Sequence, residues 1–512
     1  MSEKFDSRAP TLDPRRSLDA EKQNIEISVE EQPSKGVQSW DPTKLPWARK
    51  IHVIVAGFTC TFNCNLGSSM PSGALTAISE HFSVTDKVQL TLLNSLYMLG
   101  YVISPLVVGP LCEFIGRRPV LIGTFIGYMV FMLACSGAPS YSALLVFRLL
   151  CGFNAAAPTT VINGLYADIL DNPSERGSAI SFYQAVTTCG PLIGPIISGF
   201  SSQLSWRWPF WAAAIIASPG LPIVLTIPET FAPILQNKDI RRKIKKGLAG
   251  PESLEQMHVF NPRKIFVRPF VLLFTEPILL FACLYLTLVY SVFYLMFQAY
   301  PILFQRHYGL SPGVAGLAFL PTALGAIVAM AIAGLWTWYY DRSVDAGKPW
   351  ALREVNRRLP LACMAAPLYV PPPIPKTSFK LIEYNSMVIA LFWLGWTAWD
   401  FVSPVLPAFS GFFFGLGFQL VFIGMSNYIN DVFRELSASA QAAAGTTRSI
   451  GAVLLPLAAG PMYDSLGIHW APSLLGFIAL IMGVIPFAFI RYGDILAAKS
   501  KSARDIYGYS SS

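Results

Sequence analysis

Two arginines stand inside long apolar stretches of this sequence, where a charge is costly to hold. Arg148 lies in an apolar run at 142–167, and Arg448 lies in another at 438–461. An arginine at membrane depth costs several kcal/mol unless it faces a water-filled cavity or a partner group. Arg148 therefore predicts a polar functional site inside a membrane. The alternative is a structural anchor whose guanidinium reaches the nearer membrane surface.

A second group of charges sits in the connection between the apolar runs 89–109 and 119–137. Its sequence is Gly109-Pro110-Leu111-Cys112-Glu113-Phe114-Ile115-Gly116-Arg117-Arg118-Pro119. Each flanking run has about 20 residues, enough for an α-helix to cross a ~30 Å hydrocarbon core. The paired arginines place the turn on the cytoplasmic side, because Lys and Arg accumulate in short cytoplasmic loops. The chemistry that these residues predict is ion pairing between helix ends.

No residue pattern predicts enzyme chemistry or a cofactor. The sequence contains no Walker A loop, no His-Glu-x-x-His and no Gly-x-Ser-x-Gly. Cys60 and Cys64 are one helical turn apart but have no further ligands nearby, so they are interpreted as small packing residues. We expect neither a metal nor a cofactor, and a protein that is not an enzyme.

Composition identifies a membrane protein. Of the 512 residues, 53% are hydrophobic and 13% are charged, whereas a soluble domain carries about 25% charged residues. The net charge of +8 gathers beside the apolar segments, so it predicts orientation and lipid contact and no nucleic-acid partner. Helical spans are predicted at about 51–75, 89–109, 119–137, 142–167, 178–200, 208–227, 276–304, 312–338, 403–430, 438–461 and 469–491, with a broken ninth span between the eighth and tenth.

The predicted fold is all-α and polytopic, with twelve transmembrane helices in two six-helix bundles. The predicted parts are a disordered cytoplasmic tail at 1–46, bundles at 47–227 and 276–491, a basic cytoplasmic linker at 228–275 and a cytoplasmic tail at 492–512. The polar start has no signal-peptide pattern. The linker core, 238–246, is predicted to be a basic helix on the inner leaflet. Both termini are expected in the cytoplasm.

The ninth span is interrupted. Two half-length apolar runs, 359–369 and 387–398, flank the segment 370–386, which holds four prolines and three charges. Such a segment cannot continue a lipid-facing helix, and joining its flanks would give one span of ordinary length. We interpret 370–386 as an insertion, which is either a genuine excursion outside the membrane or an intron retained in the gene model.

The fifth span repeats a glycine-proline pair, in Gly190-Pro191-Leu192-Ile193-Gly194-Pro195-Ile196-Ile197-Ser198-Gly199. Gly190 and Gly194 share one helix face and allow close helix packing. Pro191 and Pro195 kink the helix and free backbone carbonyl groups.

These motifs together resemble the major facilitator superfamily. The turn at 109–119 is similar to its loop between helices two and three, Arg148-x-x-x-Gly152 to its fourth-helix motif, and Gly-Pro-x-x-Gly-Pro to its antiporter motif. With Pro228-Glu229-Thr230 after the sixth span, the chain over about 45–495 resembles the 12-span drug:proton antiporters of the fungal multidrug and polyamine-exporter type.

The resemblance implies roles for individual residues. It makes Arg148 the candidate for proton coupling. The residues of the antiporter motif are Gly190, Pro191, Gly194, Pro195 and Gly199. Candidates for conformational gating are Gly109, Glu113, Gly116, Arg117, Arg118, Asp168, Glu175 and Arg176. Candidates for the wall of a substrate cavity are Asn63, Asn94, Tyr97, Asn154, Gln184, Tyr290, Tyr294, Gln298, Gln419 and Asn427. Each cavity candidate could instead join two helices by a hydrogen bond.

The function that the resemblance implies is proton-coupled efflux by alternating access. The expected substrates are lipophilic or cationic small molecules such as drugs, polyamines or secondary metabolites, and the expected partners are protons and the lipid bilayer. A monomer in the plasma membrane is expected, with the vacuolar membrane as the alternative location. One alternative function is a proton symporter that imports a nutrient. The other is a protein that does not transport, either a membrane sensor or a protein inactivated by the insertion.

Overall fold

The computed structural model describes residues 42–170, 173–245, 262–351, 355–364, 386–433 and 436–499, and within these ranges every regular element is a helix. This confirms the all-α prediction. The elements up to residue 245 are η1 (Pro42–Lys44), α2 (Trp47–Ser69), η2 (Met70–Ala74), α3 (Leu75–Phe82), α4 (Lys87–Ile115), α5 (Arg117–Ser136), α6 (Tyr141–Ala155), α7 (Ala157–Ile169), α8 (Pro173–Ser201), α9 (Trp208–Ala217), α10 (Gly220–Leu225) and α11 (Ala232–Lys245).

The second part of the chain forms a similar series. Its elements are α12 (Pro262–Thr275), α13 (Pro277–Tyr300), η4 (Pro301–His307), α14 (Pro312–Leu317), α15 (Leu320–Asp345), α16 (Val355–Met364), α17 (Ser386–Thr397), α18 (Val405–Phe433), α19 (Ser437–Leu457), α20 (Ala459–Met482) and α21 (Val484–Lys499). Gly467 has a non-helical backbone and divides α20 into the end of one span and the start of the next.

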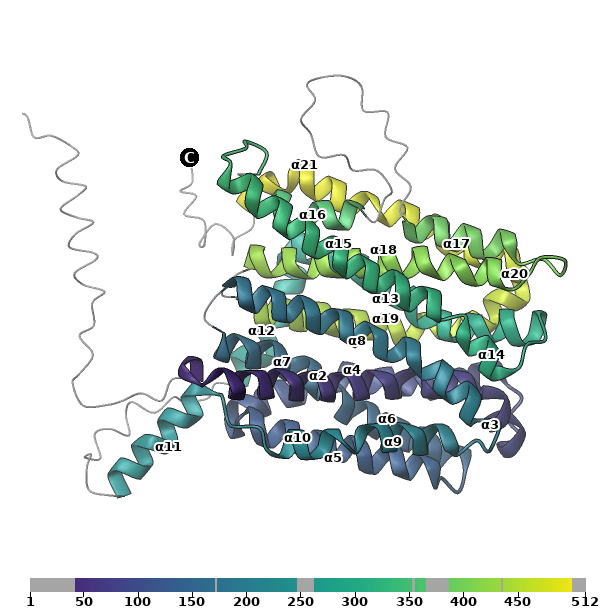
Figure 1. Cartoon of the computed structure of the whole chain (residues 1–512), viewed down its shortest axis with the longest axis horizontal. Coiled ribbons are helices and arrows are strands. Elements are labelled where there is room, and N and C mark those ends of the chain that lie inside the picture. The colour runs from purple at the N-terminus through teal and green to yellow at the C-terminus, as the bar shows by residue number, and fades with distance from the viewer. Residues whose placement is uncertain are drawn as a thin grey trace, which may run out of the picture. The chain divides into compact units, whose positions relative to one another are not determined.

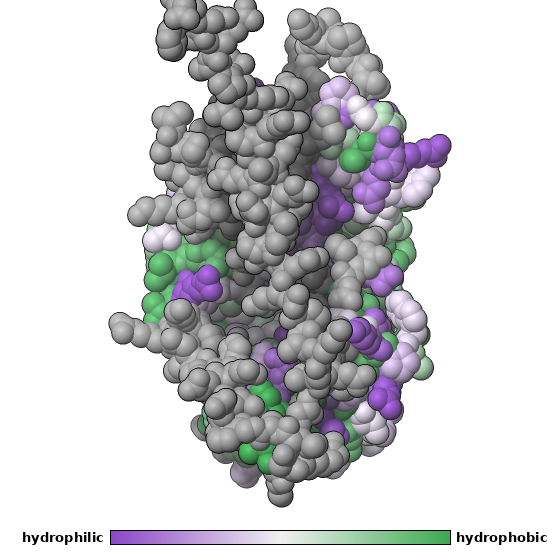
Figure 2. All heavy atoms as spheres, turned by 90° about the vertical axis from the view of Figure 1, so that its left-hand side faces the viewer, coloured by the Kyte–Doolittle hydropathy of each residue, from purple (hydrophilic) through white to green (hydrophobic). Residues whose placement is uncertain are grey.

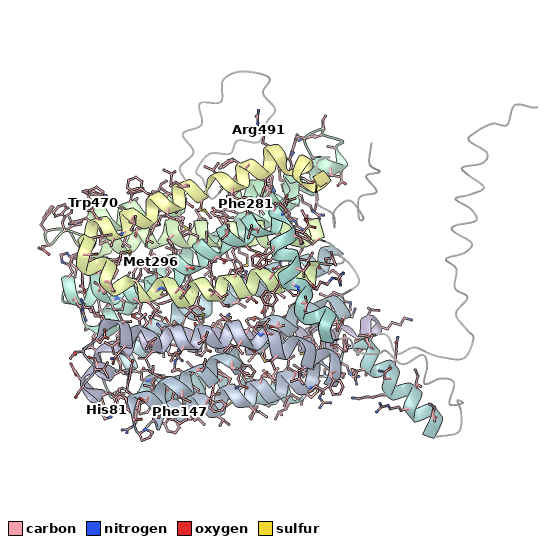
Figure 3. The ribbon with its side chains drawn as sticks, turned by 180° about the vertical axis from the view of Figure 1, so that it is seen from behind. His81, Phe147, Phe281, Met296, Trp470 and Arg491 are labelled. Atoms are coloured by element: carbon pink, nitrogen blue, oxygen red, sulfur yellow. The ribbon has the colours of Figure 1, made fainter. Side chains whose placement is uncertain are left out.

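The helices up to α10 pack against one another as one half, and those from α13 to α21 pack as a second half beside it (Figure 1). Helix α4 runs from one end of this bundle to the other, so we call these the Lys87 end and the Arg117 end. Figure 3 shows His81 and Trp470 at the Lys87 end and Arg491 at the opposite end. Figure 2 faces the Arg117 end, where both hydrophilic and hydrophobic side chains of the described residues reach the surface.

The outward faces of the helices are apolar. Phe274, Leu335 and Ile481 have exposed fractions of 78%, 66% and 71%. Among the described residues, seven helical segments are long and apolar enough to cross a membrane. Large apolar side chains that face outward along such helices indicate a lipid environment.

Local signals set several helix starts. The Asp86 side chain accepts a hydrogen bond from the Val88 amide and begins α4, and the Ser140 side chain does the same for Ala143 at the start of α6. Proline at the first turn begins α13, where its missing N–H costs nothing.

One part of the chain differs from the expected plan, whereas the ninth span is divided as expected. The expected linker contains a helix at its basic core, α11, but its last residues form a further helix, α12, which packs against α19. The ninth span consists of two short helices, α16 and α17, that both pack against α18. Of the interrupting segment 370–386, only Ser386 falls within the described residues.

Candidate functional site

The predicted gating turn contains an ion pair. Arg117 begins α5 and Asp168 lies in the last turn of α7, and their side chains meet with Nε to Oδ2 at 2.9 Å. A second nitrogen of Arg117 donates to the other carboxylate oxygen at 3.1 Å. Two parallel bonds between a guanidinium and a carboxylate are a strong and directional arrangement. The pair fixes the start of the third span to the end of the fourth.

Glu229 completes this cluster, and the residue was not among the predicted gating residues. Its carboxylate accepts hydrogen bonds from the backbone amides of Arg117 at 3.0 Å and Arg118 at 3.3 Å. It also accepts from the amides of Thr230 and Phe231, each at 3.1 Å. A carboxylate at a helix start satisfies amides that have no partner in the helix and interacts favourably with the helix dipole. Glu229 therefore attaches the end of the sixth span to the start of α5.

Gly116 is required where it stands. Its φ is +102°, and an added Cβ would lie 2.4 Å from Oε2 of Glu229. Only glycine adopts this backbone conformation without strain, and only glycine leaves room for the carboxylate. The glycine of the predicted motif thus makes space for the glutamate found here.

Asp168 is a titratable group of this cluster with a shifted pKa. Burial raises the pKa of Asp168 to about 6, although Arg117 and the Thr230 hydroxyl act to lower it. Desolvation disfavours the charged carboxylate more than these partners stabilise it. The Arg117–Asp168 pair can therefore change its charge in mildly acidic conditions.

Beyond the Arg118 amide that bonds to Glu229, the predicted gating residues that the structure describes make other contacts. Arg118 donates to the Leu225 carbonyl at 3.3 Å, and Gly109 packs near Thr160 of α7. Glu175 is exposed in the first turn of α8. The side chains of Glu113 and Arg176 lie outside the described residues.

The second half repeats the ion pair. Arg358, in α16, bonds to Asp431, in the last turn of α18, with Nε to Oδ2 at 2.9 Å. The pair joins the start of the ninth span to the end of the tenth, as Arg117 and Asp168 join the third to the fourth. Such a repeat is expected of two related bundles.

Arg148 is fully buried and binds backbone carbonyl groups. Its guanidinium donates to the carbonyls of Leu93 at 2.9 Å, Gly67 at 2.8 Å and Ser68 at 3.0 Å. Gly67 has a free carbonyl because the residue four positions later is Pro71, which has no N–H. Arg148 therefore holds the point where α2 gives way to η2, and its guanidinium is enclosed by protein.

Several cavity candidates meet between the two halves. Tyr294 shares a hydrogen bond with Ser68 of α2 at 3.2 Å, and Gln419 of α18 accepts one from Thr188 of α8 at 2.8 Å. Tyr290 lies beside Tyr294, with ring centroids 5.0 Å apart. These contacts place the α13 and α18 candidates opposite α2 and α8.

Some amide groups here have unused hydrogen-bonding capacity. Within the described part of the chain, no hydrogen bond is made by the following buried atoms: Asn63 Oδ1, both amide atoms of Asn94, Gln184 Oε1, Gln298 Nε2 and Gln419 Nε2. Such atoms are costly in an apolar interior, so their presence favours a polar ligand or water.

Two of the remaining candidates contact helices of their own half, and a third is buried. Tyr97 donates to the Cys64 carbonyl, and Arg148 lies over its ring at 4.3 Å. Asn154 faces α5, where its Oδ1 would lie 2.3 Å from a Cβ added to Gly127. Asn427 is buried in α18. Asn154 is thus separate from the set between the halves.

The glycine-proline helix α8 packs against helices of both halves. An added Cβ on Gly194 would lie 2.1 Å from Ser69 of α2, and one on Gly199 would lie 2.3 Å from the Pro312 carbonyl of α14. The prolines free the carbonyls of Thr187 and Pro191, and these accept hydrogen bonds from Asn65 at 3.3 Å and Ser69 at 2.7 Å. The carbonyls that the prolines were expected to free are therefore present and bonded.

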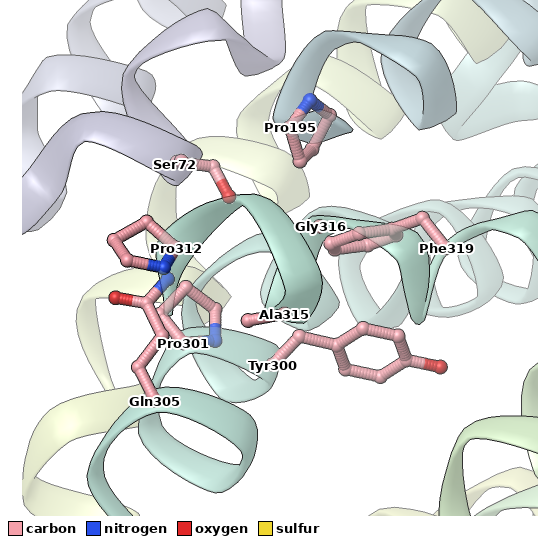
Figure 4. Close-up of a pocket in the computed structure, with 10 residues that line it drawn as sticks. Ser72, Pro195, Tyr300, Pro301, Gln305, Pro312, Ala315, Gly316 and Phe319 are labelled. Carbon is pink, nitrogen blue, oxygen red and sulfur yellow. The ribbon is translucent and has the colours of Figure 1, made fainter. Parts of the chain in front are cut away.

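The Lys87 end is tightly closed between the halves. Lys87 forms an ion pair with Asp464, and Ser72 donates to the Phe297 carbonyl at 2.8 Å. The cavity beside these contacts is only about 10 Å³ (Figure 4), which is about the room for one water. Its lining residues are Ser72, Gly73, Pro195, Tyr300, Pro301, Gln305, Pro312, Ala315, Gly316 and Phe319.

The fold and these sites define a multi-pass membrane protein made of two related helical halves with a polar contact region between them. A family model described as the Major Facilitator Superfamily matches residues 57–382. The chain belongs to this superfamily, whose members move small molecules across membranes.

Its relatives include fungal transporters. The chain is 32% identical over 469 residues to the efflux pump FUBT of Fusarium oxysporum, covering 90% of this chain and 75% of the relative. It is 33% identical over 473 residues to the citrinin biosynthesis cluster MFS transporter mrr1 of Monascus ruber, covering 90% and 89%. A crystal structure of a D-xylose-proton symporter aligns with a TM-score of 0.57 and 14% identity, covering 85% of this chain and 97% of that one. This last likeness supports the fold alone.

Proposed function

We propose that the protein is a proton-coupled efflux transporter that exports small organic molecules by alternating access. Relatives over 90% of the chain are named as an efflux pump and as a transporter of a biosynthesis cluster, which favours secondary metabolites among the lipophilic or cationic compounds considered. The fifth-span glycine-proline pattern supports export over the alternative of nutrient import.

The observation that carries the proposal is the position of α8. This helix contacts α2 in its own half, through Gly194, and α14 in the other half, through Gly199. Glycine-lined contacts allow two helix backbones to approach closely, and the helices can separate without disrupting interdigitated side chains. We assign α8 and α14 to the gate at the Lys87 end.

The orientation follows from charge. The paired arginines and the neighbouring Lys and Arg residues favour a cytoplasmic location for the Arg117 end and for both termini. The closed Lys87 end then faces outward, and the structure corresponds to a state closed to the exterior. A monomer with two bundles, at 47–227 and 276–491, in the plasma membrane completes the proposal.

Proton coupling is assigned to the region around Arg148. Arg148 and Glu276 are the fully buried charged side chains of the described residues. Arg148 binds the carbonyls where α2 ends and η2 begins. Its proposed role in coupling is to position this junction of the two helices. A change in its hydrogen bonds would move the extracellular part of the first span.

The test uses inside-out membrane vesicles that contain the protein and an imposed proton gradient. The probes are planar organic anions, neutral analogues and lipophilic cations. We expect uptake of at least one probe, and its loss when an ionophore collapses the gradient. Arg148→Lys should lower the gradient-driven uptake at least about tenfold, because an ammonium cannot reproduce three directed guanidinium bonds.

Arg207→Lys is the matched control, since Arg207 lies beside Trp206 at the Lys87 end and donates to the Ser136 carbonyl. It should transport like the parent. Uptake that is the same with and without the proton gradient would reject the proposed proton antiport. Gradient-driven uptake only in right-side-out vesicles, with the gradient directed inward, would favour the importer.

A further inference from the structure

Arg448 is the second arginine in the interior, and its surroundings differ from those of Arg148. It lies on α19 and is partly exposed. Its guanidinium carbon lies 4.7 Å from the ring centroid of Phe422 and 5.6 Å from that of Tyr290. Within the described residues, the guanidinium makes no hydrogen bond or ion pair, so only aromatic faces stabilise its charge.

The contrast with Arg148 shows that this arrangement is not the general way in which the protein holds an arginine. Arg148 has no exposed surface, and each of its three nitrogen atoms donates to a backbone carbonyl. Toward the residues that the structure describes, Arg448 keeps its five N–H donors available. The guanidinium of Arg448 is therefore suited to bind a ligand, whereas that of Arg148 is suited to hold backbone.

No carboxylate in the described spans balances this charge. The buried carboxylate of the described residues, Glu276, precedes α13, and Tyr290 follows it by 14 residues, which is about 21 Å of helix. The middle of the bundle thus contains two arginines and no acidic side chain in the described ranges. A positive interior of low dielectric disfavours a polycation and favours an anion.

The wall beside Arg448 consists of parallel aromatic rings. Tyr290 is stacked on Phe418 and Phe422 at interplanar angles of 26° and 22°. Phe293 is stacked on Phe418 with centroids 4.4 Å apart and an angle of 18°. Flat, nearly parallel faces are complementary to a further flat ring, by offset stacking.

We propose that Arg448, Tyr290 and Phe422 form a binding subsite for a planar organic anion, such as a carboxylate or enolate conjugated to a ring. The guanidinium would bind the anionic oxygens through two parallel N–H donors, and the aromatic wall would stack on the ring. Tyr290 lies beside Tyr294, whose hydroxyl shares a hydrogen bond with Ser68 of α2, so the subsite lies next to the opposite half. This inference rests on the proposed transport function and narrows its substrate class.

The test measures equilibrium binding to the purified protein in nanodiscs, without a proton gradient. The probes are 2-naphthoate, its neutral isostere 2-naphthamide and the cation 2-naphthylmethylammonium. We expect naphthoate to bind at least about tenfold more tightly than the other two, since a charge-assisted bidentate bond supports only the anion.

Two variants locate the subsite. Arg448→Gln should abolish the preference for naphthoate over naphthamide, and Arg448→Lys should retain a smaller preference. Arg342→Gln is the matched control, because Arg342 is exposed and lies 5.5 Å from the Trp338 ring. It should bind like the parent.

The result that overturns the proposal is a parent protein that does not bind naphthoate, or that binds naphthamide or the cation equally well. An unchanged preference in Arg448→Gln would also overturn it. The parent's selectivity decides the matter even if a variant does not fold. Anion-selective binding without gradient-driven uptake would instead reject antiport and leave the subsite intact.

Discussion

At the scale of single residues, Asp168 makes stability depend on pH. Its carboxyl has a pKa of about 6 in the folded protein and a usual value of 3.8, with burial as the main cause. Between these values the folded state binds more protons than the unfolded state, so the free energy of unfolding decreases as pH rises from about 4 to about 6. The shift corresponds to at most about 3 kcal/mol.

We therefore expect Asp168→Asn to remove part of the pH dependence of stability. The measurement is the thermal unfolding temperature in detergent at pH 4.5 and pH 7, for parent and variant. The parent should lose more stability than the variant on going to pH 7. Equal pH profiles would show that Asp168 is already ionised at pH 4.5, with Arg117 outweighing burial.

At the scale of helices, prolines determine where polar side chains are needed. A proline leaves the carbonyl four residues earlier without its helical partner. In this protein Pro191, Pro195 and Pro301 free the carbonyls of Thr187, Pro191 and Phe297. These carbonyls accept hydrogen bonds from Asn65, Ser69 and Ser72, all on the first span and its extension. The proline-containing segments are thus attached to the first span at fixed points.

Ser69→Ala should leave the Pro191 carbonyl without a partner and destabilise the protein by about 1–3 kcal/mol, because a buried acceptor would lose its hydrogen bond. Thermal unfolding in detergent measures the effect. Ser465→Ala is the control, since Ser465 is exposed and bonds only within its own helix. If the two variants lose equal stability, the Pro191 carbonyl of α8 accepts a hydrogen bond from water in place of the serine.

The sequence predicts such local features well and distant ones poorly. Apolar run length, prolines and charged turns identified the all-α fold, the freed carbonyls of α8 and the charged turn that contains Arg117, because each signal lies within a few residues. Glu229 was missed as a gating residue because its amide partners are 112 and 111 residues away. Asn154 was placed with the cavity residues because spacing alone does not show which neighbour a helix face meets.

At the scale of the whole molecule, the two halves show the same design. Arg117–Asp168 and Arg358–Asp431 each join a helix start to the end of the next span. In the second half, α16 and α17 stand where the first half has one continuous helix, α5. Their lengths of 10 and 12 residues together equal about the 20 residues that one span needs.

The contacts with α18 show how closely the two short helices approach each other. Gly424 packs against Ala362 of α16, and Gly417 packs against Met387 of α17. These glycines are seven residues apart, about 10 Å along α18. Because α16 runs toward α17 along the same neighbour, a few residues suffice to connect them as one helix.

We therefore expect a version that lacks 370–385 to fold and to be at least as stable as the parent, since both flanks keep their contacts with α18 and the connection becomes shorter. Thermal unfolding and vesicle uptake, measured side by side, test this. A control version that lacks 386–397 removes α17 and should not fold. If the version without 370–385 also fails to fold, the segment contributes to the second half, and the interpretation of it as an insertion into an otherwise complete span is wrong. If it folds and gains transport that the parent lacks, the segment blocks the transport cycle.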